Sequence, residues 1–240
     1  ENDVTQMINH LKSTLILLAF TLVVIFFPNC RGDIIATDED YSTYGWSMYE
    51  NKDYMDALVW FGDAIKKDSS HFDAYNGMGW SMGHLRQVDS SVYYFQKYLS
   101  QDSSFVDVLD FYAGLSFAYN AIGNDTLARK YAETYFFGNQ NSDLDADWCF
   151  CHNTDINQLD VRLILAISEF RMALFDNCQS SVNQIYKDMG LSTVLNEDLT
   201  TVQGRTVLVG HISTLQKSIK SGENGLKCSE DDGSGGGYCS

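Results

Sequence analysis

Proline is almost missing from this chain, in which Pro28 is the only one among 240 residues. Proline commonly ends a helix because it has no backbone N–H and restricts the residue before it. Helix ends beyond Pro28 must therefore be set by other residues. The aspartates and serines suit this role because their side chains cap helices.

Positive charge is also scarce. The sequence has 16 lysines and arginines against 32 aspartates and glutamates, so its net charge is −16. A chain this acidic repels polyanions at physiological salt. Nucleic acid and bare anionic lipid are therefore not expected as partners.

The sequence carries none of the common catalytic signatures. It has no Gly-x-Ser-x-Gly element, no phosphate-binding loop and no dinucleotide fingerprint. The acidic clusters at 38–40 and 143–147 fall on expected loops or helix caps and indicate a solvated surface. We therefore expect no catalytic residue, no cofactor and no enzymatic activity.

What the sequence does contain is an internal repeat between Tyr41 and Ser104. A shift of 34 residues places Tyr41 on Tyr75, the run Gly-Trp-Ser-Met at 45–48 on the same run at 79–82, and Phe61 on Phe95. A fixed period of this length is typical of stacked repeat proteins. Apolar residues inside each unit follow two helical stripes that are separated by a polar turn at 51–53.

This unit resembles the tetratricopeptide repeat (TPR), a helix-turn-helix motif of the same length. The resemblance implies an all-α, right-handed superhelix, and a final amphipathic helix would cover its exposed end. We expect a signal or anchor segment at 1–30, a tether at 31–37, three repeats at 38–138, an insert loop at 139–158, a degenerate fourth repeat at 159–190, a linker and capping helix at 191–220, and a disordered tail at 221–240.

The N-terminal stretch is typical of a signal peptide. Leu15 to Phe27 is almost wholly apolar, follows Lys12, and is too short to span a bilayer comfortably. Cys30 comes directly afterwards, as in a bacterial lipoprotein signal, although Asn29 stands where a small residue is usual. We expect lipidation of Cys30 and a place in the bacterial cell envelope, preferably the outer membrane. Ordinary secretion and an uncleaved anchor are the alternatives.

The segment from Trp148 to Ala166 extends the resemblance, because it is similar to the non-repeat insert of bacterial TPR lipoproteins. Its Cys149 and Cys151 are spaced too closely for the usual zinc pairing, so no metal site is expected. In an oxidising compartment, a disulfide from one of them to Cys178 is natural. Two free thiols are the alternative.

The family resemblance also indicates a binding surface on the first helices of the repeats. In TPR proteins these helices line a concave groove, and the corresponding residues here are Trp46, Tyr49, Asn76, Trp80 and His84. We therefore expect a membrane-tethered scaffold that binds a protein or peptide there. One alternative places Trp46 and Trp80 in the core, and another makes the chain an assembly module organised by a disulfide or metal at Cys149 and Cys151.

Overall fold

The computed structural model describes residues 12, 14, 35–99, 108–138 and 148–221, arranged in two compact units, Glu1–Ala36 and Thr37–Ser240. The fold described below is that of the second unit. The expected lipidation site Cys30, the signal segment apart from residues 12 and 14, residues 139–147 of the insert loop and nearly all of the tail lie outside the described residues. No helix in the described part of the chain is long and apolar enough to cross a bilayer.

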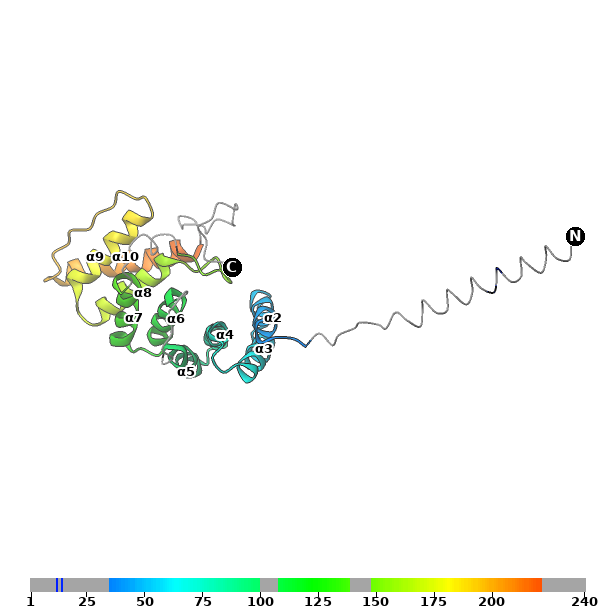
Figure 1. Cartoon of the computed structure of the whole chain (residues 1–240). Helices are drawn as coiled ribbons and strands as arrows, with labels where there is room; N and C mark the ends of the chain where they lie inside the picture. Colours follow the sequence, from blue (N-terminus) through cyan, green and yellow to red (C-terminus); the bar gives the residue numbers. More distant parts are fainter. Residues whose placement is uncertain (1–11, 13, 15–34, 100–107, 139–147, 222–240) are drawn as a thin grey trace, which may run out of the picture. The chain divides into compact units, whose positions relative to one another are not determined.

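The described part of the second unit is helical throughout (Figure 1). The helices are α2 (Asp38–Glu50), α3 (Tyr54–Lys67), α4 (Phe72–His84), α5 (Val88–Leu99), α6 (Val108–Ala121), α7 (Asp125–Phe137), α8 (Gln158–Arg171), α9 (Phe175–Asp188) and α10 (Val202–Ser221). No strand occurs in these ranges, and the one β-bridge there joins Cys149 to Asn157. The all-α prediction is therefore confirmed for the described residues.

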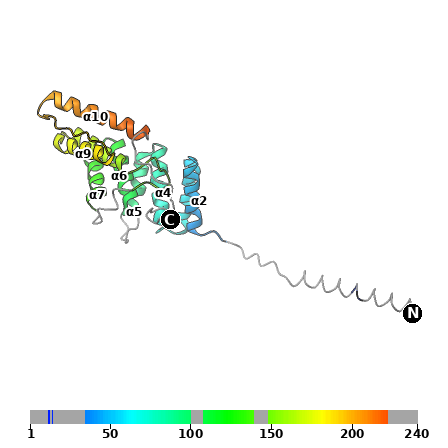
Figure 2. The same cartoon turned by 90° about the horizontal axis from the view of Figure 1, so that it is seen from above.

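The helices pack in the order of the chain. The hairpins α2–α3, α4–α5, α6–α7 and α8–α9 each pack on the next, and the first helices α2, α4, α6 and α8 also contact one another along the stack (Figures 1 and 2). We call α2, α4, α6 and α8 the first-helix layer. This consecutive packing is that of an α-solenoid.

All four hairpins turn in the same way. One residue in each turn has a positive φ, namely Lys52, Arg86, Gly123 and Ala173. The next residue donates its N–H to a carbonyl five residues earlier, for example Asp53 to Met48 at 2.9 Å and Leu174 to Glu169 at 2.9 Å. This bond satisfies a helix-end carbonyl that would otherwise lack a partner. The α8–α9 pair thus has the turn of the regular repeats despite its divergent sequence.

Two phenylalanines on the second helices lock neighbouring hairpins together. The fully buried ring of Phe61 lies between Gly45 and Gly77, where an added Cβ would come within 2.7 Å and 2.1 Å of ring atoms. Phe95 occupies the same position one repeat later. Side chains larger than hydrogen cannot fit at these contacts, so the glycines allow the helices to approach closely.

A second hydrophobic cluster lies at the C-terminal end of the stack. It joins α8 and α9 to α10 and to the segment that precedes α10, with Leu208 and Leu215 of α10 buried. The thiol of Cys178 on α9 is fully buried in this cluster. Helix α10 therefore covers the apolar faces of the last hairpin.

Candidate functional site

The candidate site is built around residues 148–157, which we call the strap. The strap doubles back on itself, because the N–H of Phe150 donates to the carbonyl of Ile156 at 2.9 Å. It ends at Asn157, which caps α8 in a capping box with Asp160. Trp148 and Phe150 are buried, with exposed fractions of 5% and 0%, whereas the intervening Cys149 is only half-buried. Alternate side chains of the strap are thus turned inward.

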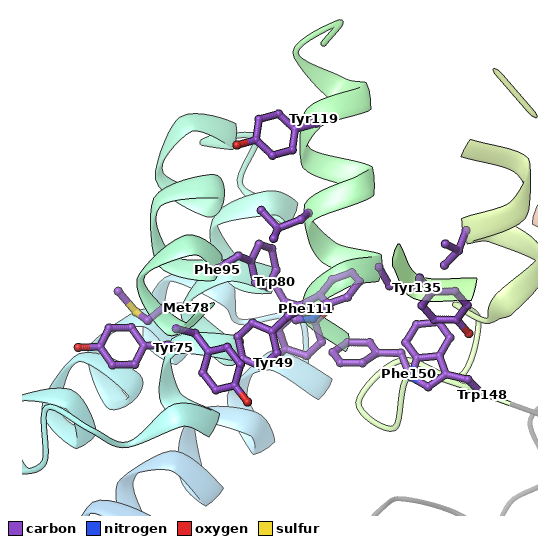
Figure 3. Close-up of a cluster of buried hydrophobic side chains, with 14 of the residues drawn as sticks. Tyr49, Tyr75, Met78, Trp80, Phe95, Phe111, Tyr119, Tyr135, Trp148 and Phe150 are labelled. Carbon is purple, nitrogen blue, oxygen red and sulfur yellow. The ribbon is translucent and has the colours of Figure 1, made fainter. Parts of the chain in front are cut away.

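The strap packs across the first-helix layer, one side chain for each of three helices. Trp148 Nε1 donates to Asp110 Oδ1 of α6 at 2.9 Å. The Phe150 ring stacks on Trp80 of α4, with centroids 4.3 Å apart. Figure 3 shows Trp80, Phe150 and Trp148 in one cluster of buried side chains.

His152 makes the third contact, at the far end of the strap. Its imidazole stacks on the indole of Trp46 in α2, with centroids 3.6 Å apart and planes 4° from parallel. Its Nδ1 also lies 2.8 Å from Oε1 of Glu50. The strap therefore connects α6, α4 and α2.

Four of the five residues expected to bind a partner are buried. The exposed fractions are 5% for Trp46, 2% for Tyr49, 4% for Asn76 and 6% for Trp80, while His84 at the end of α4 is exposed. The strap covers Trp46 and the part of Trp80 on which Phe150 stacks, so a partner cannot reach these surfaces while the strap is in place. This arrangement agrees with the alternative that the two tryptophans are core residues.

The fifth residue, His84, is tied to this core. Its Nε2 lies 2.9 Å from the hydroxyl of Tyr49, and its ring stacks on Tyr54 with centroids 4.4 Å apart. Partial desolvation of the ring beside Tyr49 and Tyr54, with a smaller contribution from Lys52, lowers the pKa of His84, so the imidazole is neutral at pH 7. Burial raises the pKa of Tyr49, which keeps its proton.

Aspartates link successive repeats through hydrogen bonds. Asp73 at the start of α4 accepts from the Ser42 hydroxyl and, at 2.7 Å, from Trp46 Nε1. One repeat later, Asp110 accepts from Asn76 Nδ2 at 3.2 Å. Trp80 is the counterpart of Trp46, yet its Nε1 is buried with no hydrogen-bond partner. Trp148 of the strap donates to Asp110, the aspartate that corresponds to Asp73.

The cysteine prediction is wrong in its pairing. Cys149 and Cys151 of the strap are both disulfide-bonded, whereas Cys178 is a free thiol. Cys178 lies in the second cluster, between α8, α9 and α10. The strap packs instead on the other hydrophobic cluster, which contains Trp46 and Trp80. The two locations explain why no bond forms to Cys178. Within the described ranges, no group of three or more His, Cys, Asp or Glu residues could hold a metal ion.

One hollow remains beside the strap. A pocket of about 310 Å³ lies between the C-terminal halves of α4 and α6, helix α5, Ile156 of the strap and the start of α8. Trp80 and Phe117 provide aromatic walls, and Ala118 and Ala121 leave the space open. A pocket with apolar walls and few polar groups is the usual form of a binding site.

The polar side chains that line this pocket are His84, Asp160 and Ser91, whose hydroxyl donates to the carbonyl of Gly79 at 2.7 Å. Asp160 Oδ2 accepts the backbone N–H of Asn157 at 3.0 Å, which satisfies the cap of α8. Burial raises the pKa of Asp160 to about 6, against the effect of that hydrogen bond, and Asp155 raises it slightly further. No lysine or arginine of the described chain forms an ion pair with Asp160. The pocket thus holds a desolvated carboxyl group without a counter-ion.

Sequence reasoning missed this pocket and Asp160. Its walls come from two repeats, the strap and α8, which are far apart along the chain. The one available signal was the pair Asn157 and Asp160, whose spacing predicts a capping box at the start of a helix. That signal gives the position of Asp160 but no role in binding.

Comparisons of the chain with models of known protein families and with curated proteins found no match.

Proposed function

We propose that this chain is a TPR-type interaction scaffold of the bacterial cell envelope, tethered to a membrane and binding a protein or peptide partner. The observation that carries the proposal is the strap: the first-helix layer already binds a segment of chain through the alternate side chains of Trp148, Phe150 and His152. Surfaces that bind extended peptides use such alternation, because successive side chains of an extended chain point to opposite sides.

Several features support a right-handed TPR superhelix as the frame. Helix α2 begins at Asp38 and α4 at Phe72, one 34-residue period later. The four hairpins share one turn, and the close contact of Phe61 with Gly77 recurs between Phe95 and Gly114. Repeated contacts of this kind make each unit pack on its neighbour in the same way.

The partner is proposed to anchor in the pocket and not on the surfaces of Trp46 and Trp80 that the strap covers. Full burial of one large apolar side chain stabilises a fold by about 1.5–3 kcal/mol. Trp148 and Phe150 are both buried, and the strap gains hydrogen bonds besides. A partner that displaced the strap would have to replace these buried side chains and hydrogen bonds. The pocket beside the strap is open without any such rearrangement.

The proposed tether is a lipid on Cys30. The apolar run from Leu15 to Phe27 directly precedes this cysteine, as in lipoprotein signals. The acidic chain has no electrostatic attraction to anionic lipid, so a covalent lipid would supply the attachment. Incorporation of labelled fatty acid by the wild-type chain, and its loss in Cys30→Ala, tests this part of the proposal. An unlabelled wild-type chain would contradict it.

The binding proposal is tested by blocking the pocket. Peptides selected from a displayed random library against the wild-type chain are titrated onto Ala121→Phe, in which a ring enters the pocket mouth. We expect their affinity to fall at least about tenfold, which corresponds to about 1.4 kcal/mol.

The matched control is Ile122→Phe, which adds a ring at the neighbouring exposed position that does not line the pocket. It should leave the affinity unchanged. If Ala121→Phe binds the selected peptides as tightly as the wild type does, the pocket is not the partner site.

A further inference from the structure

We propose that the pocket beside the strap receives a basic side chain of the partner, a lysine or arginine whose apolar stem lies along the aromatic walls and whose charged head pairs with Asp160. This inference rests on the proposed function, since it names the chemistry of the anchor that the pocket accepts. It goes beyond that function because it assigns Asp160 as a specificity-determining residue.

The walls suit the stem and the charge of such a side chain. Trp80 and Phe117 both line the pocket, with ring centroids 5.9 Å apart. Aromatic rings offer apolar surface to a methylene chain, and their faces attract a cation electrostatically. With a volume of about 310 Å³, the pocket is large enough for one long side chain.

Asp160 supplies the complementary charge. Its Oδ2 accepts the N–H of Asn157, but no basic side chain of the described residues pairs with it. A carboxylate held in such a poorly solvated place gains more from a cation than an exposed carboxylate does. His84, the other titratable group that lines the pocket, is neutral and does not compete for this role.

The net charge of the molecule also favours a positively charged ligand. The net charge is −16, so a basic segment is attracted over distance, whereas an acidic one is repelled. An acidic anchor would also bring a second carboxylate next to Asp160, which costs free energy. A cation on an apolar stem is the class of ligand that can both pack on the aromatic walls and pair with the Asp160 carboxylate.

The experiment uses two probes of equal length, the hexylammonium ion and 1-hexanol, titrated onto the full chain and followed by tryptophan fluorescence and by NMR. In the wild type, we expect hexylammonium to bind at least about fivefold tighter than hexanol. In Asp160→Asn, whose amide oxygen can still cap α8, the two probes should bind equally. Asp176→Asn, which removes an exposed carboxylate on α9, is the control and should behave as the wild type does.

The outcomes separate this inference from the proposed function. If both probes bind equally to the wild type, or if Asp160→Asn keeps the preference for the ammonium ion, the charge assignment is wrong although the pocket still binds. If neither probe binds, or if Ala121→Phe leaves their binding unchanged, the pocket is no site and both proposals fail. Retained helical circular dichroism shows that each variant is folded.

Discussion

Trp148 Nε1 donates a hydrogen bond of 2.9 Å to Asp110 Oδ1, although 38 residues separate the two. Between the first and second repeats, the corresponding aspartate, Asp73, accepts from a repeat tryptophan, Trp46. Between the second and third repeats, the strap provides the donor, and Trp80 Nε1 stays buried without a partner. The strap therefore replaces an interaction between repeats with one of its own.

This difference can be measured with matched Trp→Phe variants. Trp148→Phe removes a donor to a carboxylate, and such a hydrogen bond contributes about 1.5–3 kcal/mol to stability. Trp80→Phe removes the same atoms without breaking any hydrogen bond. We expect Trp148→Phe to lower the free energy of unfolding by at least about 1 kcal/mol more than Trp80→Phe does, as measured by urea denaturation. Equal losses would show that the Trp148–Asp110 bond does not stabilise the fold.

The glycines provide a second matched pair. A Cβ at Gly77 would lie 2.1 Å from the Phe61 ring, whereas at Gly62 it would meet nothing within 4 Å. Gly77→Ala should therefore lower the free energy of unfolding by about 1–3 kcal/mol through overpacking. Gly62→Ala should raise it by up to about 1 kcal/mol, because alanine favours the helix. Thermal and urea unfolding of both variants checks this, and a stable Gly77→Ala would contradict the packing described for Phe61.

The stability of the chain should depend on the ionisation of Asp160. Its pKa rises to about 6 in the folded chain, from an ordinary value of 3.8. Between these pH values, the folded state holds a proton that the unfolded state has released, so stability from this group falls as the pH rises through about 6. The melting temperature of Asp160→Asn, measured relative to that of the wild type, should therefore increase as the pH is raised from 4 to 7.5.

A control for this prediction is Asp40, which occupies the same capping position in α2. Hydrogen bonds from Thr37 lower the pKa of Asp40, so its contribution is present at neutral pH and is lost as the pH falls through that lowered value. The melting temperature of Asp40→Asn relative to the wild type should accordingly stay nearly constant between pH 4 and pH 7.5, because Asp40 titrates below this range. If the melting temperatures of the two variants, relative to the wild type, changed with pH in the same way, the assignment of Asp160 as a destabilised carboxylate would be wrong.

The free thiol of Cys178 should be inert in the folded protein. Burial raises its pKa to about 12, and the thiolate is the reactive form. Iodoacetamide at pH 8 should leave Cys178 unmodified in native protein and should label it once urea is added, as mapped by mass spectrometry of peptides. Labelling under native conditions would show that α10 does not cover this part of the second cluster.

The repeats were predictable from the sequence because their contacts are local. The 34-residue offset places Phe61 and Phe95 at equivalent positions, and in the structure each ring packs against glycines of two neighbouring repeats. Helical periodicity extends to α8 and α9, which have the same turn although their sequence has diverged. A repeating pattern fixes which residues of neighbouring units meet, and this determined the solenoid-like packing.

The site was not predictable in the same way. Periodicity gives no position for a segment that does not repeat, so nothing in the sequence indicated that His152 would stack on Trp46 or that Phe150 would cover Trp80. The disulfide pairing failed for the same reason, because the partner of a cysteine depends on tertiary position. The sequence indicated Asp160 only as a helix cap, because the other walls of the pocket that it lines come from other helices.

The contact between His152 and Glu50 joins two residues that are 102 positions apart in the sequence. It connects the strap, which leads into the last hairpin, to helix α2. A linear array of repeats touches only its neighbours, so it can fray from one end while the other end stays folded. The strap makes the first three hairpins share one set of contacts, so loss of α2 also removes the support of the segment leading into α8. Unfolding should accordingly be closer to all-or-none than in a simple array, and folding should be slower because closure of this long loop must precede the gain from its contacts.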